Sequence, residues 1–242
     1  MEVCEQCKSL LSGLTVISGG ATGADMAALE TAESFGIKTQ GHVHIYYAGK
    51  EGDQDPEALQ RMERFNLQFI DRDSYKEKDK CNVQDADVVV CFYQGDVATG
   101  TYKEKTSAGA LQTAFFALKQ DYSMNPALIK EYVDDMFEKG RGFSPVSEKS
   151  DDGTKVVLLI PIVGSRFNNA SWLGQALLHE AKTRQYKLKV MFSGPTEGGL
   201  EGATEIVRGY AHHALSKIVC YQRVEEPAAT GLHHLCGATS EQ

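Results

Sequence analysis

Hydrophobic and polar positions along the chain form two repeating patterns, short apolar runs and segments with helical spacing. The apolar runs are rich in β-branched residues, which is typical of strands buried on both faces of a parallel sheet. In the segments between them, apolar residues recur three and four positions apart, and this predicts helices that pack on the sheet. Five strands are predicted, at residues 14–17, 37–44, 88–92, 156–160 and 188–192. Strands that alternate with helices predict an α/β, Rossmann-like fold with a doubly wound, mostly parallel sheet of about five or more strands.

The same patterns predict one domain over residues 1–242, because the sheet pattern resumes after every irregular segment. An extension at residues 1–12 precedes the first strand, and a loose tail at about 225–242 follows the last helix. A helical insert at about 121–153 begins at Asn125-Pro126, an N-cap followed by proline. The insert ends in a segment rich in Ser, Gly and charge, which is predicted to be a mobile loop.

The pattern is less regular before the third strand. Helical spacing from Ala58 to Phe69 gives way to a charged stretch at 71–80. Asn82, Asp85 and Asp87 then precede the strand directly, and we interpret the three mainly as a capped helical turn that leads into the sheet.

Glycine- and hydroxyl-rich turns follow the first, third and fifth predicted strands. The first turn, Ser18 to Gly23, leads into a helix whose start leaves backbone N–H groups without partners and carries a partial positive charge. Glycines let an anion approach such a backbone closely, so a phosphate group is the expected ligand. Ligands of doubly wound sheets bind beyond the carboxyl ends of the strands, which favours one site built from several turns. The candidate ligand-binding residues are Ser18, Gly19, Gly20, Thr22, Gly23, Asp25, Gly95, Thr99, Gly100, Thr101, Arg166, Ser193 and Gly194.

The first turn differs from two common phosphate loops. It lacks the Gly-Lys-Ser/Thr ending of a P-loop, and with it the lysine and the magnesium ligand of an NTPase. Where a dinucleotide fingerprint places an acidic residue for the ribose, about 20 residues on, this chain has Gln40, Gly41 and His42. The alternative is a turn that serves packing alone, with Asp25 complementing the helix dipole.

Composition and charge exclude some partners. Hydrophobic residues make up 42% and charged residues 24% of the 242 residues, which is ordinary for a soluble globular protein. The net charge of −8, without a basic cluster, argues against nucleic-acid binding. The longest apolar run, at 156–163, contains a proline and is too short to span a bilayer, and the N-terminus lacks the features of a signal peptide. We therefore expect a cytoplasmic protein without membrane contact, and a homo-oligomer that buries the apolar faces of the insert and the last helix.

Six cysteines are too sparse for a disulfide scaffold, so free thiols are expected. No metal site is predicted. A zinc site made of Cys4, Cys7, His233, His234 and Cys236 is left open as an alternative, because these residues lie at chain ends that could meet.

Four blocks of the sequence resemble the "putative molybdenum carrier" family, a circularly permuted branch of the Rossmann-like SLOG superfamily. The blocks are ISGGATGADMAALETAESFGI, YKEKDKCNVQDADVVVCF, the ATGT turn and KLKVMFSGPTEGGLEGATEIV. The chain departs from the family at Ala21, where Gln is usual, and at Thr99-Gly100-Thr101, which replaces a more glycine-rich turn. The resemblance implies a Rossmann-like fold and a phosphate-bearing ligand, either nucleotide-like or the molybdenum cofactor.

Three functions are compatible with these features. The first is a binding protein for a phosphate-bearing small molecule. The second is an enzyme similar to the related Lonely-Guy-type phosphoribohydrolases, which cleave an N-glycosidic bond of a nucleotide. Gly100-Thr101-Tyr102-Lys103-Glu104 resembles the second half of their motif, so Glu104 is the candidate catalytic acid/base; it could equally complement a helix dipole. The third is a scaffold that binds a partner through the helix at 126–140.

Overall fold

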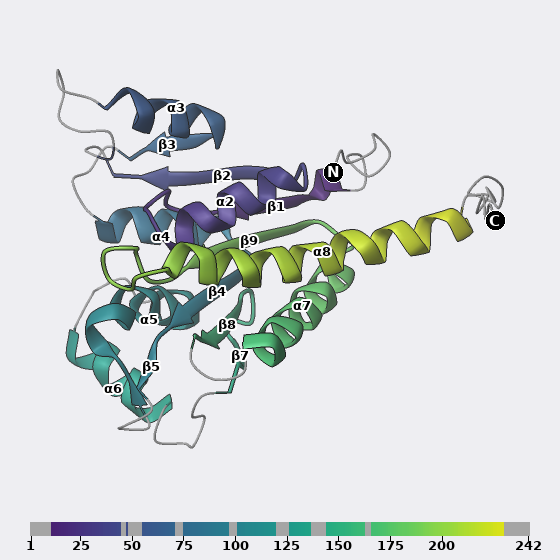
Figure 1. Ribbon diagram of the computed structural model, residues 1–242. Helices are drawn as coiled ribbons and strands as arrows, with labels where there is room; N and C mark the ends of the chain where they lie inside the picture. Colours follow the sequence, from purple (N-terminus) through teal and green to yellow (C-terminus); the bar gives the residue numbers. More distant parts are fainter. Residues whose placement is uncertain are drawn as a thin grey trace, which may run out of the picture.

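The main sheet has seven strands in the order β3-β2-β1-β9-β4-β8-β7 (Figure 1). The structure, a computed structural model, describes residues 11–44, 47, 55–70, 75–96, 101–119, 126–136, 144–162 and 166–229. The strands of the sheet are β1 (Leu14–Ile17), β2 (Lys38–Val43), β3 (Leu67–Phe69), β4 (Val88–Tyr93), β7 (Val146–Lys149), β8 (Val156–Pro161) and β9 (Leu188–Ser193). Neighbouring strands are parallel except β7, which is antiparallel to β8. Two short strands, β5 (Gly95–Asp96) and β6 (Thr101–Tyr102), form a separate antiparallel pair.

The order of the strands places β9 in the middle of the sheet, between β1 and β4. From β1 the chain moves outward through β2 to β3, and from β4 it moves outward on the other side to β8. The last strand, β9, returns to lie between β1 and β4 and pairs with both. The order in which strands are added along the sheet therefore reverses around β1, β9 and β4. Ligands of open α/β sheets bind at such a switch point.

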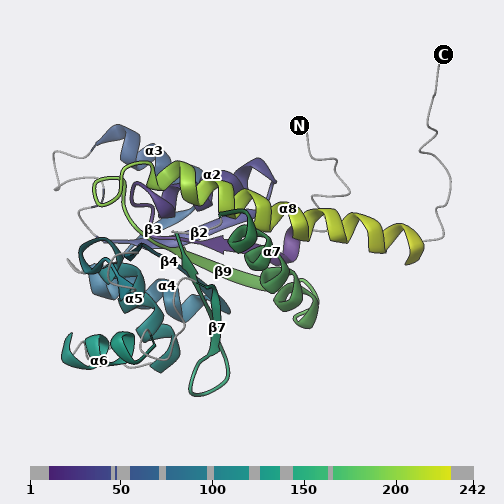
Figure 2. The same cartoon turned by 60° about the horizontal axis from the view of Figure 1, so that its bottom comes forward.

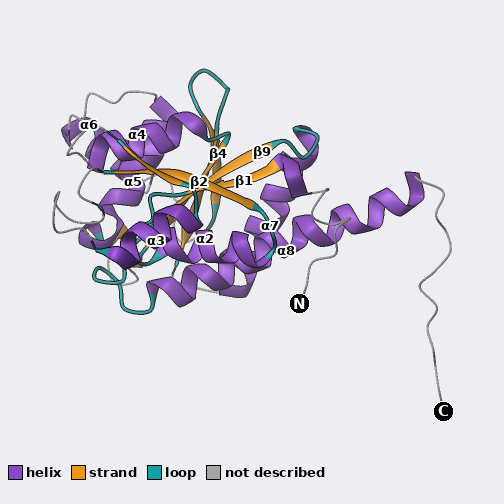
Figure 3. Ribbon diagram, turned by 90° about the horizontal axis from the view of Figure 1, so that it is seen from above, coloured by secondary structure: helices purple, strands orange, loops and turns teal. Residues whose placement is uncertain are grey.

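Helices cover both faces of the sheet (Figures 2 and 3). They are α2 (Ala24–Ser34), α3 (Pro56–Arg64), α4 (Tyr75–Asp85), α5 (Glu104–Lys119), α6 (Pro126–Met136), α7 (Arg166–Thr183) and α8 (Ala203–Ala229), and a 3-10 turn, η1 (Leu11–Gly13), precedes β1. Alternate residues of β4 point to opposite faces, as in any strand. Val88, Val90 and Phe92 pack with α2, α7 and α8, whereas Val89 and Cys91 pack with α4 and α5. The helix α6 contacts α5 and lies outside it, away from the sheet (Figure 2).

The predicted fold class is confirmed, and the five predicted strands correspond to β1, β2, β4, β8 and β9. Three local predictions were wrong. The helix expected to reach Phe69 ends at Arg64, because Asn66 adopts a positive φ of 53° and turns the chain into β3. The helical turn predicted just before the third strand is the end of a full helix, α4, and the segment predicted as a mobile loop contains the edge strand β7.

The ends of the chain are only partly described. The helix α8 continues to Ala229, so the first residues of the predicted tail are helical. The remainder of that tail and the first ten residues of the chain lie outside the described residues. In the part of the chain that the structure describes, no helix is both long and apolar enough to cross a bilayer.

Candidate functional site

The turn between β1 and α2 lies at the carboxyl edge of the sheet, next to the ends of β2 and β9. The amide of Ser18 donates to the carbonyl of Gln40 at 3.1 Å, and its buried hydroxyl donates to the carbonyl of Phe192 at 3.2 Å. The hydroxyl of Tyr47 donates to the carbonyl of Gly20 at 2.8 Å. These bonds fix the path of the turn from both sides.

The glycines of this turn are required by close contacts. Gly20 and Gly23 have positive φ values of 71° and 98°, which side chains rarely adopt. A Cβ atom at Gly20 would lie 2.8 Å from Leu67 Cδ1, and one at Gly23 would lie 2.5 Å from the carbonyl oxygen of Pro195. Protein atoms therefore occupy the Cβ side of the turn, and an anion would have to approach from the amide side.

The amides at the head of α2 are only partly free, although the sequence led us to expect them without partners. Ala24 N donates to Pro195 O at 3.1 Å, and Ala21 N donates to the carboxylate of Asp25 at 3.3 Å. Met26 N donates to Ala21 O, which closes the first helical turn. Within the described residues, no hydrogen bond engages the amides of Gly19, Gly20, Thr22, Gly23 or Asp25. This smaller group of amides can still accept an anion.

A buried lysine from α4 lies against the turn. Lys78 is 8% exposed, and a Cβ atom at Gly19 would overlap its Nζ. The same Nζ lies 3.0 Å from Asp79 Oδ1 and 3.9 Å from Asp25 Oδ2. Burial raises the pKa of Asp25, and the positive charge of Lys78 opposes that rise. A cation and two carboxylates thus border the free amides.

Sequence analysis missed Lys78, Asp79 and Tyr47. Lys78 stands four residues before Asn82, so both lie on one face of α4, and both are buried. That spacing was the available signal. It was obscured because lysine and asparagine are usually exposed, and the surrounding residues are charged.

The turn after β9 meets the turn after β1 and also packs against the strand β4. A Cβ atom at Gly194 would lie 2.8 Å from Ala24 Cβ and 3.0 Å from Phe92 Cβ. Ser193 Oγ donates to Thr113 Oγ1 of α5 at 3.3 Å. Gly95 is buried and pairs with Tyr102 in the short β5–β6 ribbon.

Several candidate residues are not described in full. Thr99 and Gly100 lie outside the described residues. Thr101, Glu104 and Arg166 begin β6, α5 and α7, and only their backbones are described. The five candidate zinc ligands at the chain ends, Cys4, Cys7, His233, His234 and Cys236, also lie outside the described residues. Among the residues that are described, no three His, Cys, Asp or Glu side chains gather as metal ligands would.

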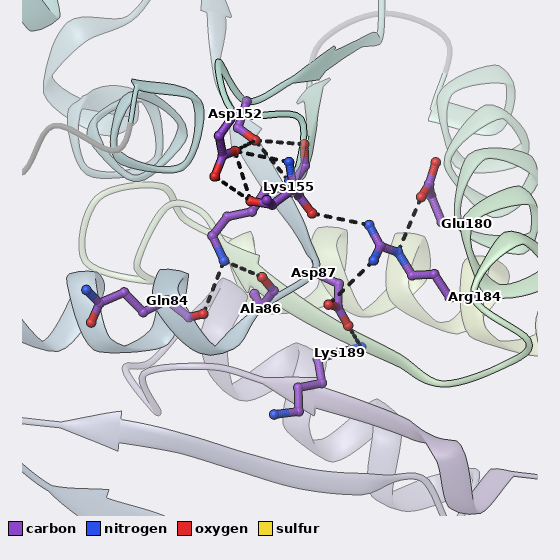
Figure 4. Close-up of polar contacts among 10 residues, drawn as sticks. Gln84, Ala86, Asp87, Asp152, Lys155, Glu180, Arg184 and Lys189 are labelled. Carbon is purple, nitrogen blue, oxygen red and sulfur yellow. Dashed lines mark hydrogen bonds and ion pairs between the residues drawn. The ribbon is translucent and has the colours of Figure 1, made fainter.

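The opposite, amino edge of the sheet carries a polar network with a structural role (Figure 4). Lys155 Nζ donates to the carbonyls of Gln84 and Ala86 at 3.1 and 2.7 Å and so caps the end of α4. Asp87 accepts from the amide of Lys189 at 2.8 Å and lies 3.6 Å from Arg184. The network borders a cavity of about 310 Å³. Asp87 thus has a structural role, but its side chain binds β9 and Arg184 rather than the helical turn that the sequence suggested.

A family model and a solved structure match this chain. The family model described as "Circularly permutated YpsA SLOG family" matches residues 16–139, just over half of the chain. A crystal structure of "Putative molybdenum carrier protein" from Syntrophus aciditrophicus SB is 20% identical, with a TM-score of 0.47, over 84% of this chain and 93% of that one. A search of curated proteins finds no match. The family match confirms the resemblance seen in the sequence and covers β1 to α6, including the glycine turn and Lys78; the chain belongs to the circularly permutated YpsA SLOG family.

Proposed function

We propose that this protein binds a phosphate-bearing small molecule at the carboxyl edge of its sheet, in the turn between β1 and α2. Membership of the SLOG family supports a ligand-binding protein in general terms. The finer proposal concerns the phosphate group, which a nucleotide-like ligand and the molybdenum cofactor share. For either ligand, the free amides of the turn and Lys78 would hold that group.

The observation that carries the proposal is a buried ammonium group beside backbone amides that have no partner among the described residues. Amides at a helix start point at an approaching anion, and the helix dipole favours negative charge there. Lys78 adds a full positive charge, and its low exposure of 8% reduces screening by water. The turn also lies at the switch point of the sheet, where the carboxyl ends of β1, β9 and β4 are neighbours.

Thermal unfolding with AMP, ADP-ribose and inorganic phosphate tests the proposal. A ligand at about 100 times its Kd stabilises the folded state by about 2.7 kcal/mol. For a chain of this length that corresponds to a rise in Tm of about 5–10 °C. The proposal fails if none of the three probes raises the Tm.

Lys78 offers a sharper test, because α4 also carries an exposed lysine, Lys76. We expect Lys78→Gln to abolish the ligand-induced shift and Lys78→Arg, which keeps the charge, to retain most of it. Lys76→Gln should behave as wild type. The Tm of each variant without ligand separates lost binding from lost folding. An undiminished shift in a folded Lys78→Gln variant would remove Lys78 from the site.

The hydrolase is a second candidate function, because Glu104 begins α5 at the same edge of the sheet. Chromatography of the AMP mixtures distinguishes the two functions. Binding without release of adenine supports a binding protein. Release of adenine that is lost in Glu104→Gln supports an N-glycosidic hydrolase with Glu104 as the acid/base group.

A further inference from the structure

Before any ligand binds, the side chains beside the turn carry more negative than positive charge. Among the described residues, Lys78, Asp25 and Asp79 form a group of one cation and two carboxylates. All three side chains are largely buried, with exposures of 10%, 13% and 20%. With all three ionised, the group carries a formal charge of −1. The ammonium is shared between two acids and cannot fully neutralise a ligand as well.

Asp25 is the acid that belongs to the turn itself. Its carboxylate accepts a hydrogen bond from the amide of Ala21, and the free amides of Gly19 and Gly20 precede that residue directly. An anion held by those amides would therefore share one short loop with the Asp25 carboxylate. Repulsion between them grows with each negative charge on the ligand, and burial weakens the screening of that repulsion.

We propose that Asp25 selects the charge of the bound phosphoryl group. The turn takes a monoanionic group, such as a phosphodiester or the bridging phosphate of a diphosphate, in preference to the dianionic group of a phosphate monoester. This inference rests on the proposed function and narrows its ligand class.

Protonation of Asp25 should relax the selection. Burial raises its pKa, Asp79 raises it further, and Lys78, the amide of Ala21 and the hydroxyl of Ser18 lower it. Because its carboxyl is already costly to ionise in this position, a nearby dianion would favour the neutral form. Among the described residues, the charged groups that act on Asp25 are Lys78 and Asp79 of α4.

The experiment compares AMP with its methyl phosphodiester, which differs mainly in charge. At about pH 8 the monoester is a dianion, since its second pKa is about 6, and the methyl ester remains a monoanion. Titration calorimetry of the wild type should then show the methyl ester binding about tenfold more tightly than AMP, as expected for one extra repulsive charge.

Asp25→Asn tests the assignment to this residue, because asparagine keeps an oxygen that can accept from Ala21 N and removes the charge. It should reduce the preference at about pH 8 to less than about threefold, mainly by tightening AMP. Glu63→Gln, an exposed position on α3, should leave the wild-type ratio unchanged.

Each outcome decides between the proposals. Equal or tighter binding of AMP by the wild type at about pH 8 overturns the charge selection and leaves the binding site standing. A preference that persists in a folded Asp25→Asn variant removes Asp25 as its source. If neither compound binds the wild type under any condition, the proposed function fails, and the selection fails with it.

Discussion

At the scale of single residues, the ionised carboxylate of Asp25 destabilises the folded protein because it is buried. Burial raises the pKa of its carboxyl above the ordinary value of 3.8. A raised pKa in the folded state means that this residue stabilises the protein fully only at low pH, and that the contribution is lost as pH rises through the folded pKa. We predict that Asp25→Asn becomes progressively more stable than the wild type as the pH rises from about 4 to about 8.

Urea unfolding of both proteins at several pH values measures this difference. Glu33, on the same helix, provides a control, because its pKa is shifted in the opposite direction. The hydrogen bond from Arg64 lowers the pKa of Glu33, so its contribution is present above its ordinary pKa of 4.5 and is lost as pH falls. Glu33 and Arg64 are exposed, so their pairing should change the stability with pH by a smaller amount than Asp25 does. A stability difference between the wild type and Asp25→Asn that does not change with pH would contradict the raised pKa.

At the scale of elements, Asn82 attaches α4 to the sheet. Its side-chain oxygen accepts from the amide of His42 at 2.7 Å, and its nitrogen donates to the carbonyl of His42 at 3.1 Å. We predict that Asn82→Ala lowers the free energy of unfolding by about 2–4 kcal/mol, because two peptide groups of β2 lose a partner at about 1–3 kcal/mol each. Lys78 lies one helical turn away, so the AMP-induced rise in Tm should decrease too.

The exposed side chain of Gln84 on the same helix supplies the control. Gln84→Ala should change the free energy of unfolding by less than about 0.5 kcal/mol, since Lys155 binds only its backbone carbonyl. Urea unfolding of the two variants compares them directly. Equal stability of Asn82→Ala and Gln84→Ala would show that the contact with β2 contributes little.

The elements differ in how far the sequence could predict them. β4 and β8 were predictable because every residue in them is buried, which requires a continuous apolar run. β7 lies at the edge, and its exposed Ser147 and Lys149 resemble a loop. α4 was missed because its buried residues include Lys78 and Asn82, whose burial depends on partners far away in the sequence.

Some features of the candidate site could also be predicted from the sequence, and others could not. Gly20 and Gly23 could be predicted because a tight turn with positive φ demands glycine locally. The pairing of Ala24 N with Pro195 O could not, because it depends on β9 returning to lie beside β1. Lys78 reaches the turn because α4 packs on the sheet beside β2, so its position also depends on contacts between distant segments.

At the scale of the molecule, the sheet has a protected centre and exposed edges. The inner strands β2, β1, β9, β4 and β8 are paired on both sides, whereas β3 and β7 are paired on one side. Amide hydrogen exchange should therefore be slowest in the five inner strands and at least about tenfold faster in β3 and β7, because edge strands open locally at lower cost. Protection of β3 equal to that of β4 would contradict the strand order.

Amide hydrogen exchange in the presence of AMP also tests the proposed binding site. The amides of Gly19, Gly20, Thr22 and Gly23 have no partner among the described residues, so they should exchange quickly without ligand. A phosphate held by those amides would slow their exchange, because each bound N–H must first release the ligand. α6 packs against α5 on the side away from the sheet, and its exchange should be unchanged. Slowing confined to α6, with the turn unaffected, would instead favour a protein that uses its helical insert to bind a partner.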